Sequence, residues 1–148
     1  MSDEIINGLK KNLEEVPEKF LKLSGEKLSS FPAPGKWSKK QILGHLCDSA
    51  LNNYSRFIRV QYETEPFDIR GYQQNEWVEY NDYQNIPPEE IVRLWTVLNK
   101  RIVNIISRIP ADKLMMKCDT GEGELYELDF IISDYLSHMN HHLEQIFG

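Results

Sequence analysis

Three of the four histidines fall within five positions, in the segment SHMNHHLEQIFG. His138 and His142 are four residues apart, a spacing that on a helix places both side chains on one face with Cβ atoms about 5–6 Å apart. Two imidazoles at that separation can bind one divalent ion at roughly 2.0–2.1 Å each. His141 projects from another face, so we expect it not to be a ligand. Such a pair alone is more often two packed histidines, satisfied by neighbours or water, than a metal site.

A third ligand would have to be His45, the remaining histidine, in ILGHLCDSALNNYSRF. At helical spacing this residue shares a polar strip with four others: Ser49, Asn52, Asn53 and Arg56. The strip is either a solvated helix face or the lining of a wet cleft between helices. In the second case His45 completes a site of three neutral nitrogens, which suits zinc, nickel or a similar ion.

Catalytic and substrate-binding groups are harder to identify. Asp48 is a candidate acceptor for the free N–H of His45 or a candidate base, and is otherwise an exposed acid. Arg56 could pair with a substrate carboxylate or with an acid of the chain, and Asn52 is a further candidate for substrate binding. Cys47 lies on the far side of its helix from His45, so we expect it not to be a ligand.

The segment PFDIRGYQQNEWVEYNDYQNIPP is long for a connection in a compact helical domain. It is either a hydrophobic flap that seals the core or a lid that supplies walls and polar groups to a substrate pocket. In the second case Trp77 contacts the substrate. Asp68 and Glu76 are then possible acid–base residues.

Four amphipathic helices are expected to position these residues. The first runs from Ser2, a candidate cap, to residue 16 and is broken by Pro17. The others cover residues 39–62, 88–109 and 128–148, and Ser38 with Gln41 forms a capping box for the second. The strand signal is weak, although GELYE could form a short extended piece. We therefore predict an all-α four-helix bundle, a single domain over residues 1–148, with a long connection between helices two and three.

Composition excludes several function classes. The chain has 148 residues, a formal net charge of −6 and a pI near 5.2, which argues against nucleic acid as a partner. It contains no apolar stretch long enough to span a membrane and no basic amphipathic segment for a membrane surface. Two distant cysteines, Cys47 and Cys118, indicate a reducing cytoplasm.

Two segments together resemble the DinB/YfiT-like superfamily: GKWSKKQILGHLCDSALNNYSRF and DYLSHMNHHLEQI. The resemblance extends over nearly the whole chain. It implies a four-helix bundle that holds a divalent metal through three histidines, which by position are His45, His138 and His142 here. It also implies that a homodimer is common. Some relatives are transferases or isomerases that use a low-molecular-weight thiol, whereas others are described as metal-dependent hydrolases.

Three hypotheses follow for the function. The chain is a metal-dependent enzyme acting on a small molecule, either a hydrolase or a thiol-dependent S-transferase. Alternatively, it binds a metal without catalysis, or it is a dimeric helical interaction protein whose histidines only pack. A site of three imidazoles leaves positions open for water or a thiol on the ion, which favours the first hypothesis. Because histidine binds metal only when neutral, metal affinity is expected to fall below about pH 6.

Overall fold

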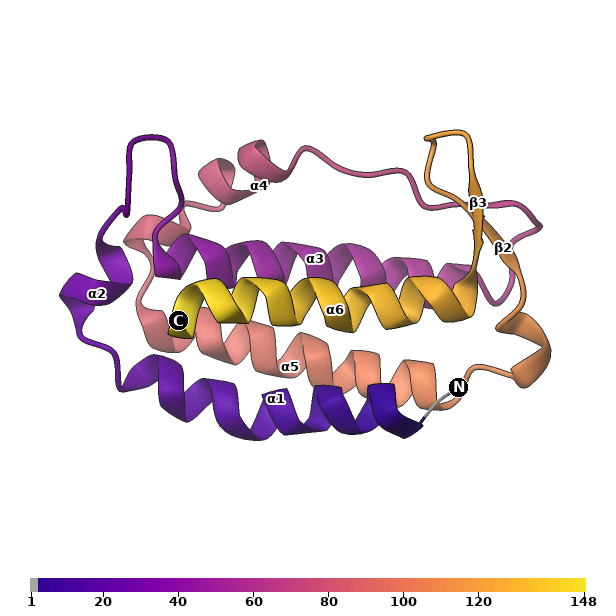
Figure 1. Ribbon diagram of the computed structural model, residues 1–148, viewed down its shortest axis with the longest axis horizontal. Helices are drawn as coiled ribbons and strands as arrows, with labels where there is room; N and C mark the ends of the chain where they lie inside the picture. The colour runs from indigo at the N-terminus through magenta and orange to yellow at the C-terminus, as the bar shows by residue number, and fades with distance from the viewer. Residues whose placement is uncertain (1–2) are drawn as a thin grey trace.

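Four long helices form the body of the protein in the computed structural model, which describes residues 3–148 (Figure 1). They are α1 (Asp3–Leu21), α3 (Lys39–Arg59), α5 (Pro88–Ser107) and α6 (Leu128–Phe147). α3 packs against both α5 and α6, α1 packs against the same two helices, and α3 and α6 run antiparallel. The predicted helical bundle is confirmed. The predicted cap Ser2 lies outside the described residues.

The core lies between these helices and sets the faces that they present to one another. Its fully buried large side chains come from all four, and include Phe20, Leu43, Phe57, Trp95, Ile102 and Ile132. Burying one side chain of this kind stabilises the fold by about 1.5–3 kcal/mol relative to exposure. This packing holds α3 and α6 in the relative rotation on which the histidine geometry depends.

Pro17 does not end the first helix, contrary to the prediction. α1 continues through it to Leu21, although a proline inside a helix removes one hydrogen bond and usually destabilises by about 3 kcal/mol. Val16 and Phe20, on either side of the proline, are both buried in the core. Breaking the helix would expose this apolar face, so tertiary packing outweighs the local preference.

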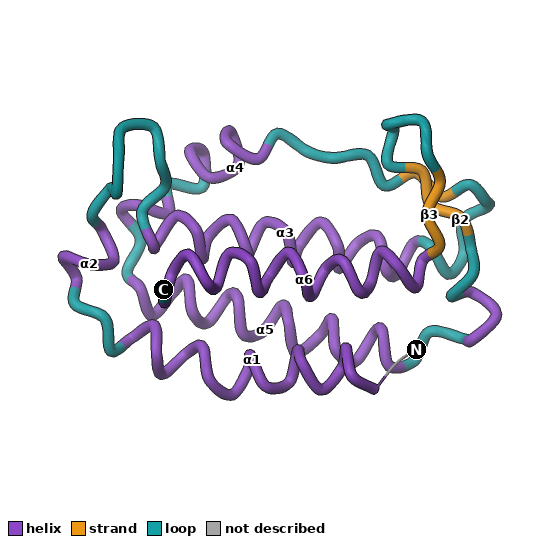
Figure 2. The backbone as a smooth tube through the Cα atoms, in the orientation of Figure 1, coloured by secondary structure: helices purple, strands orange, loops and turns teal. Residues whose placement is uncertain are grey.

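The all-α prediction is incomplete, because a small three-stranded sheet closes one end of the bundle (Figure 2). It consists of β1 (Phe67–Asp68), β2 (Lys117–Asp119) and β3 (Leu125–Glu127). β1 pairs with β2 in parallel, and β2 pairs with β3 in antiparallel fashion, with Cys118 opposite both Phe67 and Tyr126. Strands of two or three residues are too short to carry an alternating pattern, so only the piece around GELYE was visible in the sequence.

The long connection between α3 and α5 is largely ordered by packing. It contains β1, the short helix α4 (Gln74–Tyr80) and the 3₁₀ turn η1 (Tyr83–Asn85). Two further short elements lie elsewhere, α2 (Gly25–Ser29) and the 3₁₀ turn η2 (Ala111–Lys113). Phe67, Val78 and Tyr83 of the connection are buried. No helix of the described residues is long and apolar enough to cross a membrane.

Candidate metal centre

The rings of His45, His138 and His142 meet between α3 and α6. Nε2 of His45 lies 3.3 Å from Nε2 of His138, and one ring nitrogen from each of the three histidines lies within 4.8 Å of the other two. Two nitrogens bound to one tetrahedral ion at roughly 2.0–2.1 Å would be about 3.3 Å apart. The type and spacing of these donors therefore fit a divalent transition metal.

Local sequence signals position each ring. α3 begins at a capping box, in which the Ser38 hydroxyl accepts from the Gln41 amide N–H at 3.2 Å and the Gln41 side chain accepts from the Ser38 amide N–H at 3.0 Å. The box was predicted, and it fixes where the helix starts and hence which way His45 points. That ring is fully buried. On α6, the spacing of four residues stacks His138 and His142, both half-buried, on the face toward α3.

Two residues that sequence reasoning missed orient these rings. The Gln145 side-chain oxygen lies 2.9 Å from Nδ1 of His142, so that nitrogen donates and Nε2 is left with its lone pair for an ion. Trp37 packs against His45 with ring centroids 4.8 Å apart and covers it from outside. Gln145 lies three residues after His142, on the same helix face, and that spacing was a usable signal.

Burial favours the neutral form of two of the three rings, His45 and His138. The pKa of His45 falls to about 3, mainly because the charged ring would lose its hydration, and secondarily because His142 and His138 are close. Burial also lowers the pKa of His138. Neutral imidazoles carry the lone pairs that a metal requires, so the site is electrostatically prepared for a cation at neutral pH.

Asp48 is buried three residues after His45 on α3 but is not hydrogen-bonded to it. Its Oδ1 accepts from the Tyr83 hydroxyl at 2.7 Å and from the Asn81 side-chain amide at 3.1 Å. Its Oδ2 and Nδ1 of His45 are both buried without a hydrogen-bond partner. Burial raises the pKa of Asp48 to about 6, and the bond from Tyr83 opposes that rise. The expected contact with the free N–H of His45 is thus replaced by contacts with the connection.

The contact from Tyr83 requires a glycine on α3. A Cβ atom at Gly44 would lie 2.2 Å from Cδ2 of Tyr83, which is closer than any real contact of that kind. Only glycine therefore lets the tyrosine ring lie against the helix and reach Asp48. The residue immediately before His45 is constrained by this packing.

A cavity of about 270 Å³ lies next to the histidine cluster, and its lining extends from His138 to Thr120 and Glu122 near the sheet. His138 lines one end, and Ser49, Asn53 and Arg56 line it from α3. Ser49 and Asn53 are buried, so this part of the polar strip faces an internal cleft and not bulk solvent. The connection also contributes to the walls, at Tyr72.

Two expected substrate contacts lie outside this cavity. The Asn52 side chain donates to the backbone carbonyl of Asp48 at 2.8 Å, and Asn52 is not among the lining residues. Trp77 packs edge-on against Tyr72, with ring centroids 5.3 Å apart, behind the wall. Of the three residues proposed for substrate binding, only Arg56 lines the cavity.

The remaining candidates lie away from the cluster. His141 is exposed, and the Cys47 thiol is buried and faces the Ile91 carbonyl at 3.6 Å, so neither belongs to the group of three histidines. Asp68 is exposed, and its side chain accepts from the backbone of Arg70 at 3.0 Å. Glu76 is also exposed. Neither acid lines the cavity.

The fold and the cluster define a helical-bundle protein with a candidate three-histidine metal site. A family model described as the DinB superfamily matches residues 9–146, and the chain belongs to that superfamily. Proteins named as putative metal-dependent hydrolases are similar over most of it. One from Oceanobacillus iheyensis is 29% identical over 146 residues, which cover 96% of this chain and 84% of that protein. Another, from Halalkalibacterium halodurans, is 28% identical over 110 residues, 74% of this chain but only 63% of its own length.

Solved structures agree with the fold. YfiT from Bacillus subtilis, described as a probable metal-dependent hydrolase with an unusual four-helix bundle topology, superimposes with a TM-score of 0.87. It is 23% identical, and the match covers 97% of this chain and 82% of YfiT. A mycothiol-dependent maleylpyruvate isomerase superimposes with a TM-score of 0.74 at 12% identity. Here the match covers 95% of this chain but only 59% of the isomerase.

Proposed function

We propose that this protein is a metal-dependent hydrolase in which His45, His138 and His142 hold a divalent ion, zinc or nickel. The observation that carries the proposal is the 3.3 Å separation of two Nε2 atoms inside a group of three imidazoles. The relatives named as metal-dependent hydrolases support it. When bound, such an ion would lower the pKa of a coordinated water and supply a nucleophile near neutral pH.

The residues around the cluster have distinct roles in this proposal. Gln145 fixes the ring of His142 through Nδ1, and Trp37 shields His45 from solvent. Asp48 is the proposed catalytic carboxylate, because its pKa near 6 and its unpartnered Oδ2 suit a group that accepts and returns a proton. Arg56 and the cavity bind the small-molecule substrate.

Metal analysis with single histidine variants tests the proposal. We expect about one equivalent of metal in the wild-type protein and loss of it in His45→Ala and in His142→Ala. His141→Ala is the matched control, because this exposed histidine lies next to the cluster without being part of it. If all three variants keep the metal, or if the wild-type protein never takes it up, the proposal is wrong and the histidines only pack.

A second candidate is transfer to or from a low-molecular-weight thiol. It is favoured by the fold shared with a mycothiol-dependent isomerase and by the room in the cavity beside His138. Conjugation of an electrophile with a panel of small thiols, measured beside ester and amide hydrolysis, separates the two reactions. Metal-dependent turnover in neither assay would instead indicate metal binding without catalysis.

The homodimer and the cytoplasmic location remain proposals of the same kind. The first follows from the resemblance to the superfamily and the second from two free cysteines, Cys47 and Cys118. Sedimentation analysis over a range of concentrations measures the oligomeric state. A single species of monomer mass at every concentration would contradict the homodimer.

A further inference from the structure

The cavity beside His138 contains a cation, Arg56, that forms no direct ion pair among the described residues, although Asp68 stabilises its charge from a longer distance. Arg56 donates to the Arg70 carbonyl at 2.9 Å and to the Asn53 side chain at 3.4 Å. No carboxylate among residues 3–148 forms an ion pair with it. These two bonds leave several of its five N–H groups without an acceptor. A half-buried guanidinium in this state favours an anionic ligand that is planar and accepts two bonds.

Two hydroxyl groups in the same cavity also lack partners. The Tyr72 hydroxyl and the Thr120 hydroxyl are buried, and neither forms a hydrogen bond in the structure. Both residues line the cavity with Arg56. Buried polar groups in folded proteins almost always have a partner, and two orphaned donors at one cavity therefore indicate where a ligand acceptor binds.

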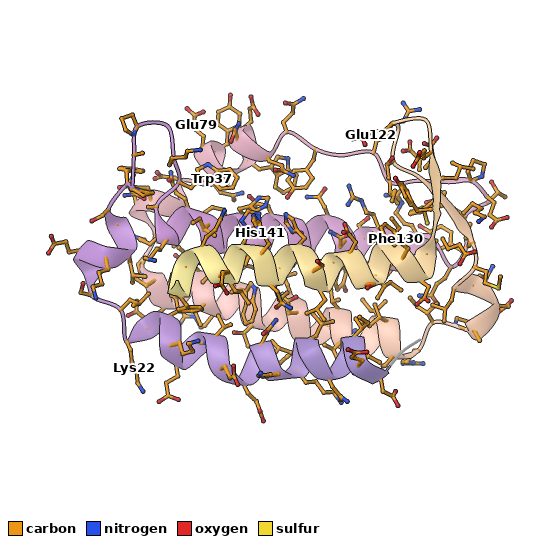
Figure 3. All side chains as sticks on the ribbon, viewed as in Figure 1. Lys22, Trp37, Glu79, Glu122, Phe130 and His141 are labelled. Atoms are coloured by element: carbon orange, nitrogen blue, oxygen red, sulfur yellow. The ribbon has the colours of Figure 1, made fainter. Side chains whose placement is uncertain are left out.

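The cavity is long enough to separate this polar end from the histidines. Ser49 and Arg56 on α3, and His138 and Ile131 on α6, each span seven residues of helix, or about 10 Å. Because the two helices are antiparallel, the residues nearest His45 and those nearest the sheet lie at opposite ends. Figure 3 labels Glu122, which lines the cavity, and Trp37, which packs against His45.

The charge at the rim limits the kind of anion that fits. Asp134 and Glu122 are exposed and line the same cavity. Their charges would repel a dianion such as phosphate more strongly than a single carboxylate. Ile69, Ile131 and Tyr135 contribute apolar wall to the cavity, which suits a hydrocarbon or aromatic part of a ligand.

We propose that this cavity binds a small monocarboxylate, with the carboxylate accepting from Arg56, Tyr72 and Thr120 and the rest of the molecule extending toward His138. As a statement about the substrate, this inference rests on the proposed function. As a statement about binding, it holds for the protein without metal. The substrate of the metal centre is then an acid whose reacting group lies at the end opposite its carboxylate.

Binding to metal-free protein tests this inference separately from catalysis. The probes are hexanoate, its neutral isostere hexanamide, and inorganic phosphate, titrated near pH 7.5 by calorimetry or by amide chemical shifts. We expect hexanoate to bind about tenfold more tightly than hexanamide and more tightly than phosphate, because a charge-assisted bond is worth roughly one decade of affinity. Equal binding of hexanoate and hexanamide, tighter binding of phosphate, or no binding of hexanoate overturns the inference.

Variants locate the carboxylate within the cavity. Arg56→Gln should weaken hexanoate about tenfold and leave hexanamide within about twofold, while Arg101→Gln, at an exposed arginine of α5, leaves both unchanged. Tyr72→Phe and Thr120→Val should each weaken hexanoate severalfold without lowering the unfolding temperature, since each removes an unsatisfied hydroxyl. Equal losses in Arg101→Gln, or no loss in the three cavity variants, overturn the inference. Failure of metal binding leaves these results unaffected, so the two proposals fail independently.

Discussion

Replacing Asp48 by Asn should stabilise the metal-free protein at neutral pH. Burial raises the pKa of this carboxyl from an ordinary 3.8 to about 6, so the folded state disfavours the ionised form. A rise of this size corresponds to about 3 kcal/mol of unfavourable free energy once the group is ionised in both states. Relaxation of the protein around a buried charge reduces this figure, and we expect a gain of about 1–2 kcal/mol.

The pH dependence of this difference identifies its cause. A raised pKa destabilises the folded state above the folded pKa and has no effect below the unfolded one, so the gain in Asp48→Asn should be full above about pH 6 and vanish below about pH 4. Denaturant unfolding of wild type and Asp48→Asn in the presence of chelator, at several pH values from about 4 to above 6, measures this difference in the free energy of unfolding. Asp112→Asn, at an exposed acid, is the control. A variant less stable than wild type at every pH would refute the reasoning, since it would mean that the carboxylate stabilises the fold.

Two further results are expected. Gly44→Ala should destabilise the folded protein by about 1–3 kcal/mol, because the added Cβ would lie 2.2 Å from the Tyr83 ring. Gly25→Ala is the control and should not destabilise, because nothing lies within 4 Å of a Cβ at that position. Equal denaturation midpoints for the two variants would contradict this. Lowering the pH to 5.5 should destabilise the metal-free protein by about 1.4 kcal/mol through His45 alone, since its pKa of about 3 lets only the unfolded state take up the proton. His45→Ala should remove this contribution and leave only that of His138, whose pKa burial also lowers; an undiminished loss in the variant would place the cause elsewhere.

The long helices and the pair of histidines on α6 were predictable from the sequence because both depend on one period. The 3.6-residue repeat places apolar side chains on one face and also places His138 and His142 together. The same helical period also identified the polar strip of α3 that contains His45. The pairing of that ring with the other two required the relative rotation of α3 and α6, which only the resemblance to a known superfamily supplied.

What sequence reasoning missed depends on contacts between distant segments. Pro17 predicts a break when read locally, and the packing of Val16 and Phe20 overrides it. Asp48 is contacted by residues 33 and 35 positions away, and no helical period relates them. Trp77 was predicted to contact the substrate as part of a lid, yet it packs edge-on against Tyr72 and does not line the cavity.

The parallel pairing of β1 with β2 links two parts of the chain that otherwise serve different sides of the cavity. β1 directly precedes the wall at Gly71 and Tyr72, while β2 and β3 lead into α6, and the Leu128 amide N–H bonds back to the Met116 carbonyl at 2.9 Å. A displacement of that wall would therefore pull on the first turn of the helix that holds His138 and His142. The cavity wall and the histidine-bearing helix are thus joined by a continuous set of backbone hydrogen bonds, and we predict that a ligand in the cavity changes the rate of metal exchange.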